Sequence, residues 1–159
     1  DEGGGRIVGE VCHFIDLMQY LTGAFPVSVF AESISAKSGK IVDADSVFIT
    51  LRFADGSNGS IAYLSEGDKG LAKERVEIFG SGRAFVLDDY RRATLYKDGR
   101  EELITLKAQD KGQQAQVRQV CASVLEGGPT RISLDELAAT SRTTFRVLDS
   151  LRERHPFEL

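Results

Sequence analysis

Seven short runs of β-favouring residues between positions 27 and 106 constrain the fold of this chain more than any other feature. They are rich in valine, isoleucine and aromatic residues, and turn signals such as Asp55-Gly56 separate them. The runs are 27–36, 46–53, 59–64, 74–79, 84–87, 94–96 and 102–106. Parallel neighbours would need crossovers of about a dozen residues, and the gaps here are shorter. The pattern therefore predicts a largely antiparallel sheet.

Helical patterns flank these runs on both sides. Residues 8–21 carry apolar side chains three and four positions apart, and Thr22-Gly23 ends that helix. Residues 113–125 repeat the pattern before Gly127, and a final helix begins at Ser133, which forms a capping-box pattern with Glu136. We expect one α+β domain over residues 1–159, with an open-faced sheet and helices packed on one side. The uncovered sheet face is a candidate interface for a homo-oligomer.

Composition excludes several classes of function. The net charge is −4 and the 20 basic residues are scattered, which argues against nucleic-acid binding. One basic cluster, formed by residues 91, 92, 97 and 100, lies among aspartates and is expected to be a solvated face. With no apolar run near 18 residues and no secretion signal, we expect a soluble, cytoplasmic protein that spans no membrane. Cys12 and Cys121 are 109 positions apart and are predicted to be free, buried thiols, and no metal site is predicted.

Three ionisable side chains, Glu10, His13 and Asp16, interrupt the first apolar helix. At 100° per residue each carboxylate lies 60° to one side of the histidine, within reach of the ring or of its substrate. An imidazole between acids on a rigid element suits proton transfer near neutral pH. Two simpler hypotheses remain open: His13 is a core or surface histidine without chemistry, and Asp16 is a structural acid bound to a nearby polar group.

Other site candidates are weaker. Asp68 and Lys69 lie in a polar loop between two β-runs, where substrate-binding groups often occur. Tyr63 could stack on a sugar ring, although strand alternation also explains it as an ordinary sheet residue. A hydrolase that uses Glu10 and Asp16 as paired carboxylates is disfavoured, because about 9 Å of helical rise and 120° of rotation separate them.

The N-terminal string G-G-G-x-x-x-G-E-x-C-H-F-I-D resembles the opening of the C-terminal domain in the glucose–fructose oxidoreductase, inositol dehydrogenase and MocA family. The family pattern is matched at Gly3, Gly4, Gly5, His13 and Asp16. Residues 76–83 also resemble the family's strand, glycine turn and strand. One position departs: the family's aspartate four residues before the histidine is Gly9 here, and the nearest acid is Glu10.

The resemblance implies an oxidoreductase that transfers a hydride between NAD or NADP and a hydroxyl of a sugar, sugar derivative or cyclitol. It implies that His13 is the catalytic acid/base or a direct partner of it, with Glu10 as its candidate partner and Asp16 near the substrate. Asp68 and Lys69 are substrate-binding candidates from their loop position alone. The resemblance also implies dimerisation through the sheet. No strand leads into a G-x-G-x-x-G helix, and the family's Glu-Lys-Pro segment is absent. We therefore expect a piece of a larger enzyme that binds no cofactor by itself. The alternative is a non-catalytic binding or dimerisation module.

Overall fold

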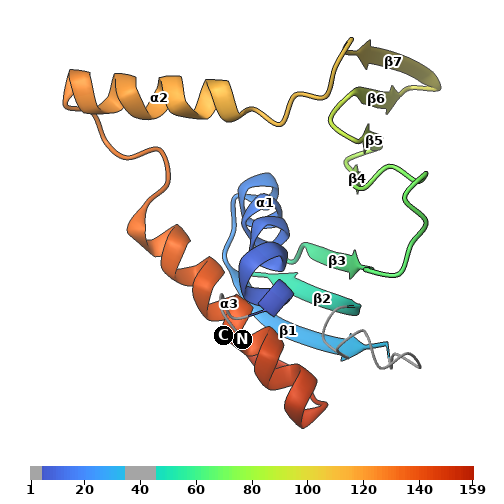
Figure 1. Ribbon diagram of the computed structural model, residues 1–159, viewed down its shortest axis with the longest axis vertical. Helices are drawn as coiled ribbons and strands as arrows, with labels where there is room; N and C mark the ends of the chain where they lie inside the picture. The colour runs from blue at the N-terminus through green and yellow to red at the C-terminus, as the bar shows by residue number, and fades with distance from the viewer. Residues whose placement is uncertain (1–4, 35–45) are drawn as a thin grey trace. The chain divides into compact units, whose positions relative to one another are not determined.

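The computed structural model describes residues 5–34 and 46–159 (Figure 1). The chain forms two compact units: residues 1–66 with 132–159, and Gly67–Arg131. Each unit contains one antiparallel four-stranded sheet, so the predicted α+β class is confirmed. Gly3, Gly4 and the loop predicted from Ser38 to Asp45 lie outside the described residues.

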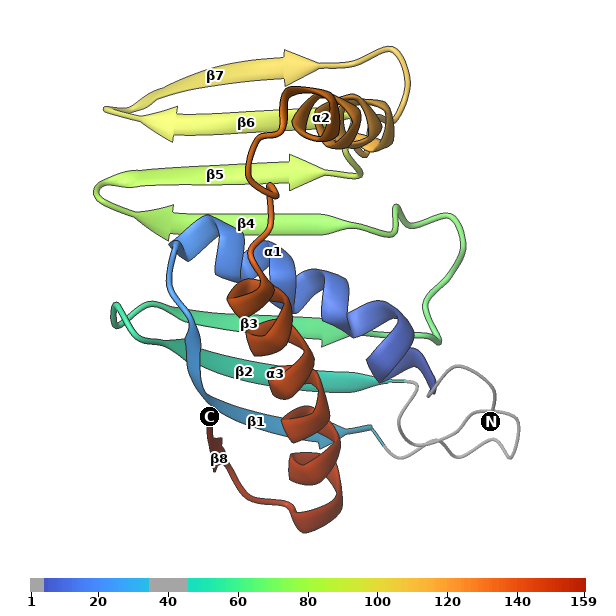
Figure 2. The same ribbon diagram turned by 90° about the vertical axis from the view of Figure 1, so that its left-hand side faces the viewer.

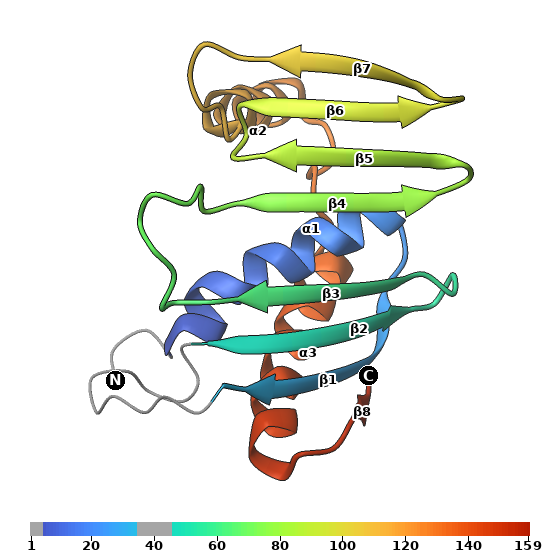
Figure 3. The same ribbon diagram turned by 90° about the vertical axis from the view of Figure 1, so that its right-hand side faces the viewer.

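The first unit has the strand order β3-β2-β1-β8. Its strands are β1 (Pro26–Ser33), β2 (Val47–Phe53), β3 (Asn58–Tyr63) and β8 (Phe157–Glu158). Helices α1 (Cys12–Thr22) and α3 (Leu134–Glu153) lie on one face of this sheet, as predicted (Figures 2 and 3). Along β2 buried and exposed residues alternate strictly, as expected for a strand with one covered face. The two-residue strand β8 was not predicted.

The core of the first unit lies between the covered sheet face and the two helices. Its fully buried members from the sheet are Val29, Ala31, Val47, Ile49, Leu51 and Phe53. Ile15 from α1 and Val147 from α3 pack into the same cluster. Their burial fixes α1 and α3 against the sheet, because removing apolar surface from water is the main stabilising term in folding.

Two polar features fix α3. At its start, the Ser133 hydroxyl accepts a hydrogen bond from the Glu136 N–H, and the Glu136 carboxylate accepts one from the Ser133 N–H, so the predicted capping box is confirmed. Near its end, the fully buried Ser150 hydroxyl accepts from the Ala31 N–H at 3.0 Å and donates to the His155 carbonyl at 2.8 Å. Strand β8 pairs only with residues 28 and 29 of β1, so it does not reach the Ala31 N–H. Ser150 supplies the acceptor that this N–H would otherwise lack.

The second unit has strands in chain order: β4 (Arg75–Gly80), β5 (Arg83–Asp88), β6 (Arg92–Lys97) and β7 (Arg100–Thr105), followed by α2 (Gln113–Glu126). The hairpin turns Ser81-Gly82 and Asp98-Gly99 have positive φ at both positions, the backbone that suits two-residue hairpin loops. Helix α2 buries none of its residues.

The two cysteines are free, as predicted, but the expected burial is wrong for Cys121. This residue lies on α2 and is exposed, whereas Cys12 is half-buried. Sequence periodicity identified the apolar face of α2, but periodicity alone does not show that a face is covered. In the described part of the chain, no helix combines the length and apolarity needed to cross a membrane.

Candidate active site

His13 lies in the first turn of α1 and its side chain is exposed. The helix continues upstream, and a π-helical segment, Ile7–Val11, comes directly before α1. A π turn is wider than an α turn because its hydrogen bonds run to the fifth residue, and such segments occur often at functional sites. Glu10 lies in this segment and is also exposed. The angle of 60° expected between Glu10 and His13 assumed α-helical geometry, which the π segment changes.

Burial explains why His13 faces solvent. The buried positions of this helix are Ile7, Val11, Ile15 and Gln19, each four residues after the last. These positions form a buried stripe along the helix. Four residues turn an α-helix about 40° past one full turn, so a stripe at this spacing drifts around the helix. The wider π turn offsets that drift at the start of the stripe. His13 falls between stripe positions, so the hypothesis of a core histidine is wrong. Within the described residues the His13 side chain forms no hydrogen bond or ion pair.

Asp16 faces α3 across the helix pair. Its side chain is half-buried, and the Thr140 hydroxyl donates a hydrogen bond to Asp16 Oδ1 at 3.5 Å. This contact supports the interpretation of Asp16 as a structural acid, with a threonine as its partner. Its role in binding substrate stays a prediction.

Gln19 joins the same two helices and was missed by sequence reasoning. Its side chain is buried, and Nε2 donates to the Glu136 carbonyl at 3.2 Å. The Gln19 Oε1 atom is buried without a hydrogen-bond partner in the described structure. The available signal was a glutamine four residues after Ile15, at a position where the apolar stripe continues. Gln19 and Asp16 therefore fix the helix that carries His13 against α3.

The other side of α1 packs on β3. The rings of Phe14 and Tyr63 meet edge to face, with centroids 6.4 Å apart. Tyr63 packs against the core, which favours the ordinary sheet residue over the sugar-stacking hypothesis. A Cβ atom at Gly59 would lie 2.7 Å from Met18 Sδ, so the glycine allows α1 to approach the strand closely.

Cys12, beside the histidine, is not suited to nucleophilic chemistry. Burial raises the pKa of its thiol, and the nearby Glu10 and Asp16 carboxylates raise it further. The thiol therefore stays protonated near neutral pH, where a nucleophilic cysteine must be a thiolate. Within this helical segment His13 is therefore the remaining candidate for proton transfer.

Asp68 and Lys69 are exposed and belong to the second unit. Asp68 Oδ1 accepts a hydrogen bond from the Gly70 N–H at 2.7 Å, and the Leu71 N–H donates to the Asp68 carbonyl. The Asp68 carboxylate thus stabilises its own turn. Lys69 makes no hydrogen bond or ion pair within the described residues. Their participation in a site with His13 stays a prediction.

The described residues contain no group of three or more His, Cys, Asp or Glu side chains placed to hold a metal ion. The expected absence of a metal site stays a prediction for the whole protein.

Comparison with known families identifies the chain's relatives. The model of the GFO/IDH/MocA C-terminal domain matches residues 1–86, which is more than half of the 159 residues. The chain belongs to this family. The match includes the helix of Glu10, His13 and Asp16, strand β4 of the second unit and the first part of β5.

Solved structures share the fold over nearly the whole chain. Aldose-aldose oxidoreductase from Caulobacter crescentus, complexed with glycerol, is 20% identical with a TM-score of 0.79, over 98% of this chain and 48% of that one. UDP-N-acetylglucosamine 3-dehydrogenase from Acidithiobacillus ferrooxidans is 22% identical with a TM-score of 0.76, over 92% and 47%. Levoglucosan dehydrogenase in its apo form is 18% identical with a TM-score of 0.77, over 99% and 51%.

These similarities establish a common fold. The chain spans about half the length of each of these structures. A search of curated proteins finds no match.

Proposed function

We propose that this chain is the substrate domain of an NAD(P)-dependent oxidoreductase that acts on a hydroxyl of a sugar, sugar derivative or cyclitol. The observation that carries the proposal is an exposed imidazole, His13, held on a packed helix in a chain of the GFO/IDH/MocA family. The enzymes with similar structures named above are an aldose oxidoreductase and dehydrogenases of sugar compounds, which supports this substrate class.

The chain's own part in the reaction is proton transfer. Oxidation of a secondary alcohol to a ketone removes a hydride from carbon and a proton from oxygen. His13 accepts the hydroxyl proton through an unprotonated ring nitrogen and returns it in the reverse reaction. Glu10 lies on the same helical segment, where its carboxylate orients the ring or accepts a neighbouring hydroxyl of the substrate. A nicotinamide cofactor, when bound, supplies the hydride acceptor.

Cofactor binding itself is assigned to the rest of the parent enzyme. This chain has no strand followed by a G-x-G-x-x-G helix, and Gly80-Ser81-Gly82 connects two antiparallel strands, β4 and β5. A strand, not a helix, follows these glycines. The glycine turn therefore offers no helix N-terminus, which is where a dinucleotide-binding motif holds the pyrophosphate. We expect the isolated chain to form no site for the nicotinamide ring, so NADH fluorescence should stay unchanged in a titration.

The test of the proposal is His13→Ala in the full-length parent, with His155→Ala as the matched control. These are the two histidines of the chain, and His155 lies beyond the end of α3 in a turn of its own. Turnover should fall by about two to four orders of magnitude for His13→Ala, with an unchanged unfolding midpoint. His155→Ala should keep normal turnover. Normal turnover in His13→Ala would refute the assignment.

A second candidate function, dimerisation, has one specific observation in its favour. Phe48 lies on the sheet face of the first unit away from α1 and α3, and its side chain is 51% exposed. We propose that this face joins two copies of the chain. Phe48→Glu should shift the mass measured by light scattering from dimer to monomer. Phe145→Glu, at a 56% exposed phenylalanine on α3, should leave the mass unchanged. A monomeric parent would contradict this proposal without affecting the role of His13.

A further inference from the structure

The strand register of the second unit brings together three cations that the sequence keeps apart. In the antiparallel ladder, Arg83 of β5 pairs with Lys97 of β6, and Lys97 pairs with Arg100 of β7. Directly paired residues point to the same face of a sheet, so the three side chains form one row across the strands. Neighbouring strands are about 4.8 Å apart, so the row spans about 10 Å. We call these residues the cationic row.

The cluster predicted from the sequence was therefore grouped wrongly. Arg92 begins β6 and Lys97 ends it, so the two lie at opposite ends of the strand, about 16 Å apart at the rise of a β-strand. Arg91 and Arg92 consequently do not belong with Lys97 and Arg100. Arg83, which is distant in the sequence, takes their place through strand pairing.

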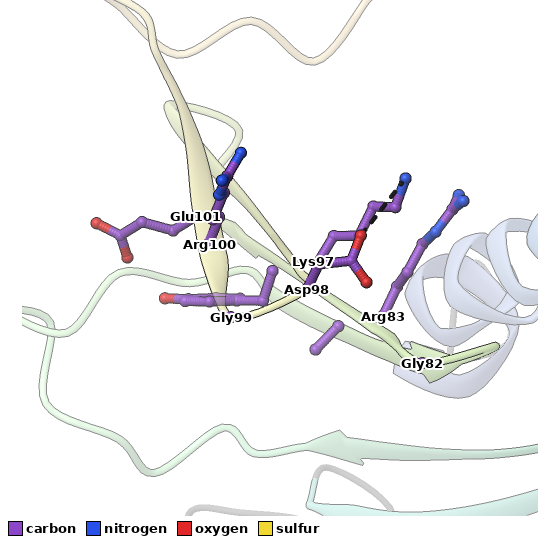
Figure 4. Close-up of a pocket in the computed structure, with 9 residues that line it drawn as sticks. Gly82, Arg83, Lys97, Asp98, Gly99, Arg100 and Glu101 are labelled. Atoms are coloured by element: carbon purple, nitrogen blue, oxygen red, sulfur yellow. Dashed lines mark ion pairs between the residues drawn. The ribbon is translucent and has the colours of Figure 1, made fainter.

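The cationic row borders a surface hollow of about 590 Å³ at the hairpin ends (Figure 4). Arg83, Lys97 and Arg100 line it together with two acids, Asp98 and Glu101, and with Ala84 and Tyr96, which share a sheet face with Glu101. Figure 4 shows Glu101, the neighbour of Arg100, extending away from Lys97 and Arg83. All three cations are exposed, so their charged groups can reach a ligand in the hollow.

The charges in the row are incompletely balanced within the second unit. Lys97 forms an ion pair with Asp98 at 3.9 Å, but the side chains of Arg83 and Arg100 form no hydrogen bond or ion pair among the described residues. Glu102 occupies the next position of the same face along β7. The three cations and the two acids that line the hollow, Asp98 and Glu101, leave a local excess of +1 in a chain whose net charge is −4. Like charges directly opposite each other destabilise a sheet, and an anion bound between them would relieve this repulsion.

We propose that the cationic row binds the phosphate groups of a phosphorylated small molecule. A phosphate group presents three strong acceptor oxygens, so it can accept hydrogen bonds from more than one cation of the row at once. Guanidinium groups bind phosphate oxygens in pairs, and a lysine adds a point charge between them. The row lies wholly within the second unit, so this site is independent of the proposed proton transfer by His13.

Titration of the full chain with pyrophosphate tests the site, by calorimetry at low salt and by amide NMR shifts. We expect saturable binding that shifts the amides of Gly82 and Gly99. Arg83→Gln and Arg100→Gln should each weaken binding about ten-fold, the size expected for losing one charge-assisted hydrogen bond. Asp98→Asn should strengthen binding several-fold, because it removes the competing anion while Asn-Gly still suits the turn.

Arg92→Gln is the control, because it removes the same charge at the opposite end of β6 and should change the affinity less than two-fold. An equal loss in Arg92→Gln, or the absence of saturable binding, would overturn the proposal. Malonate provides the second comparison, since one bridging atom separates its two carboxylates, as in pyrophosphate. Equal affinity for malonate and pyrophosphate would also overturn it, and would indicate an acidic protein segment as the partner.

Discussion

Replacing Ser150 by alanine should destabilise the first unit strongly, although the change removes a single oxygen atom. The Ser150 hydroxyl is fully buried and joins the Ala31 N–H of β1 to the His155 carbonyl beyond α3. Each buried polar group that loses its partner costs about 1–3 kcal/mol. Because the His155 carbonyl is only partly buried, we expect a total loss of about 2–4 kcal/mol in the free energy of unfolding.

Ser141→Ala on the same helix is the matched control. The Ser141 hydroxyl is exposed and donates to the Leu137 carbonyl at 2.9 Å, one turn earlier. Both substitutions gain the same helix propensity, so that contribution cancels when the two variants are compared. Ser141→Ala should change the free energy of unfolding by less than about 0.5 kcal/mol.

Urea denaturation followed by circular dichroism provides the measurement. With an m-value of about 2 kcal/mol/M, Ser150→Ala should lower the unfolding midpoint by about 1–2 M, while Ser141→Ala should leave it nearly unchanged. Equal midpoints for the two variants would show that water satisfies the Ala31 N–H. The reasoning about the edge of β1 would then be wrong.

Three further predictions concern other parts of the chain. Ser133→Ala removes the capping box of α3 and should cost about 1 kcal/mol in urea denaturation, whereas Ser133→Asp should cost much less. Hydrogen bonds to the Pro156 carbonyl and the Glu153 carboxylate raise the pKa of His155, so its NMR titration should lie above that of a model peptide and fall in Glu153→Gln. Because the folded pKa is raised, any stabilisation from His155 is fully present below its unfolded pKa and disappears as the pH rises through the folded value. Ellman's reagent at neutral pH should modify the exposed Cys121 within the dead time of mixing and Cys12 much more slowly, and equal rates would contradict the burial of Cys12.

Much of the fold could be predicted from the sequence because local signals agree with it. Turn residues such as Asp55-Gly56 separate the strands, and the capping box at Ser133 marks the start of α3 within one residue. Strand β8 was missed because its two residues pair with β1 through about 130 intervening positions, and no local pattern encodes that pairing. The division into two units also depends on such distant contacts.

The candidate site was predictable in its residues and less so in its geometry. The resemblance to a family singled out His13, whereas helical periodicity left open whether it lies in the core or on the surface. The π segment before it was not predicted, because apolar residues four apart fit an α-helix and a π turn equally well. Thr140 as the partner of Asp16 was not predictable either, since 124 residues separate them.

The order of the two units along the chain has a consequence for biosynthesis. The second unit is one continuous segment inserted into the first, and each of its strands pairs with the next one along. Its strand ladder can form as soon as the segment leaves the ribosome, whereas β1 waits for α3 and β8, about a hundred residues later. During that interval α3 does not yet cover the sheet formed by β1, β2 and β3, and the apolar surface left exposed there favours aggregation.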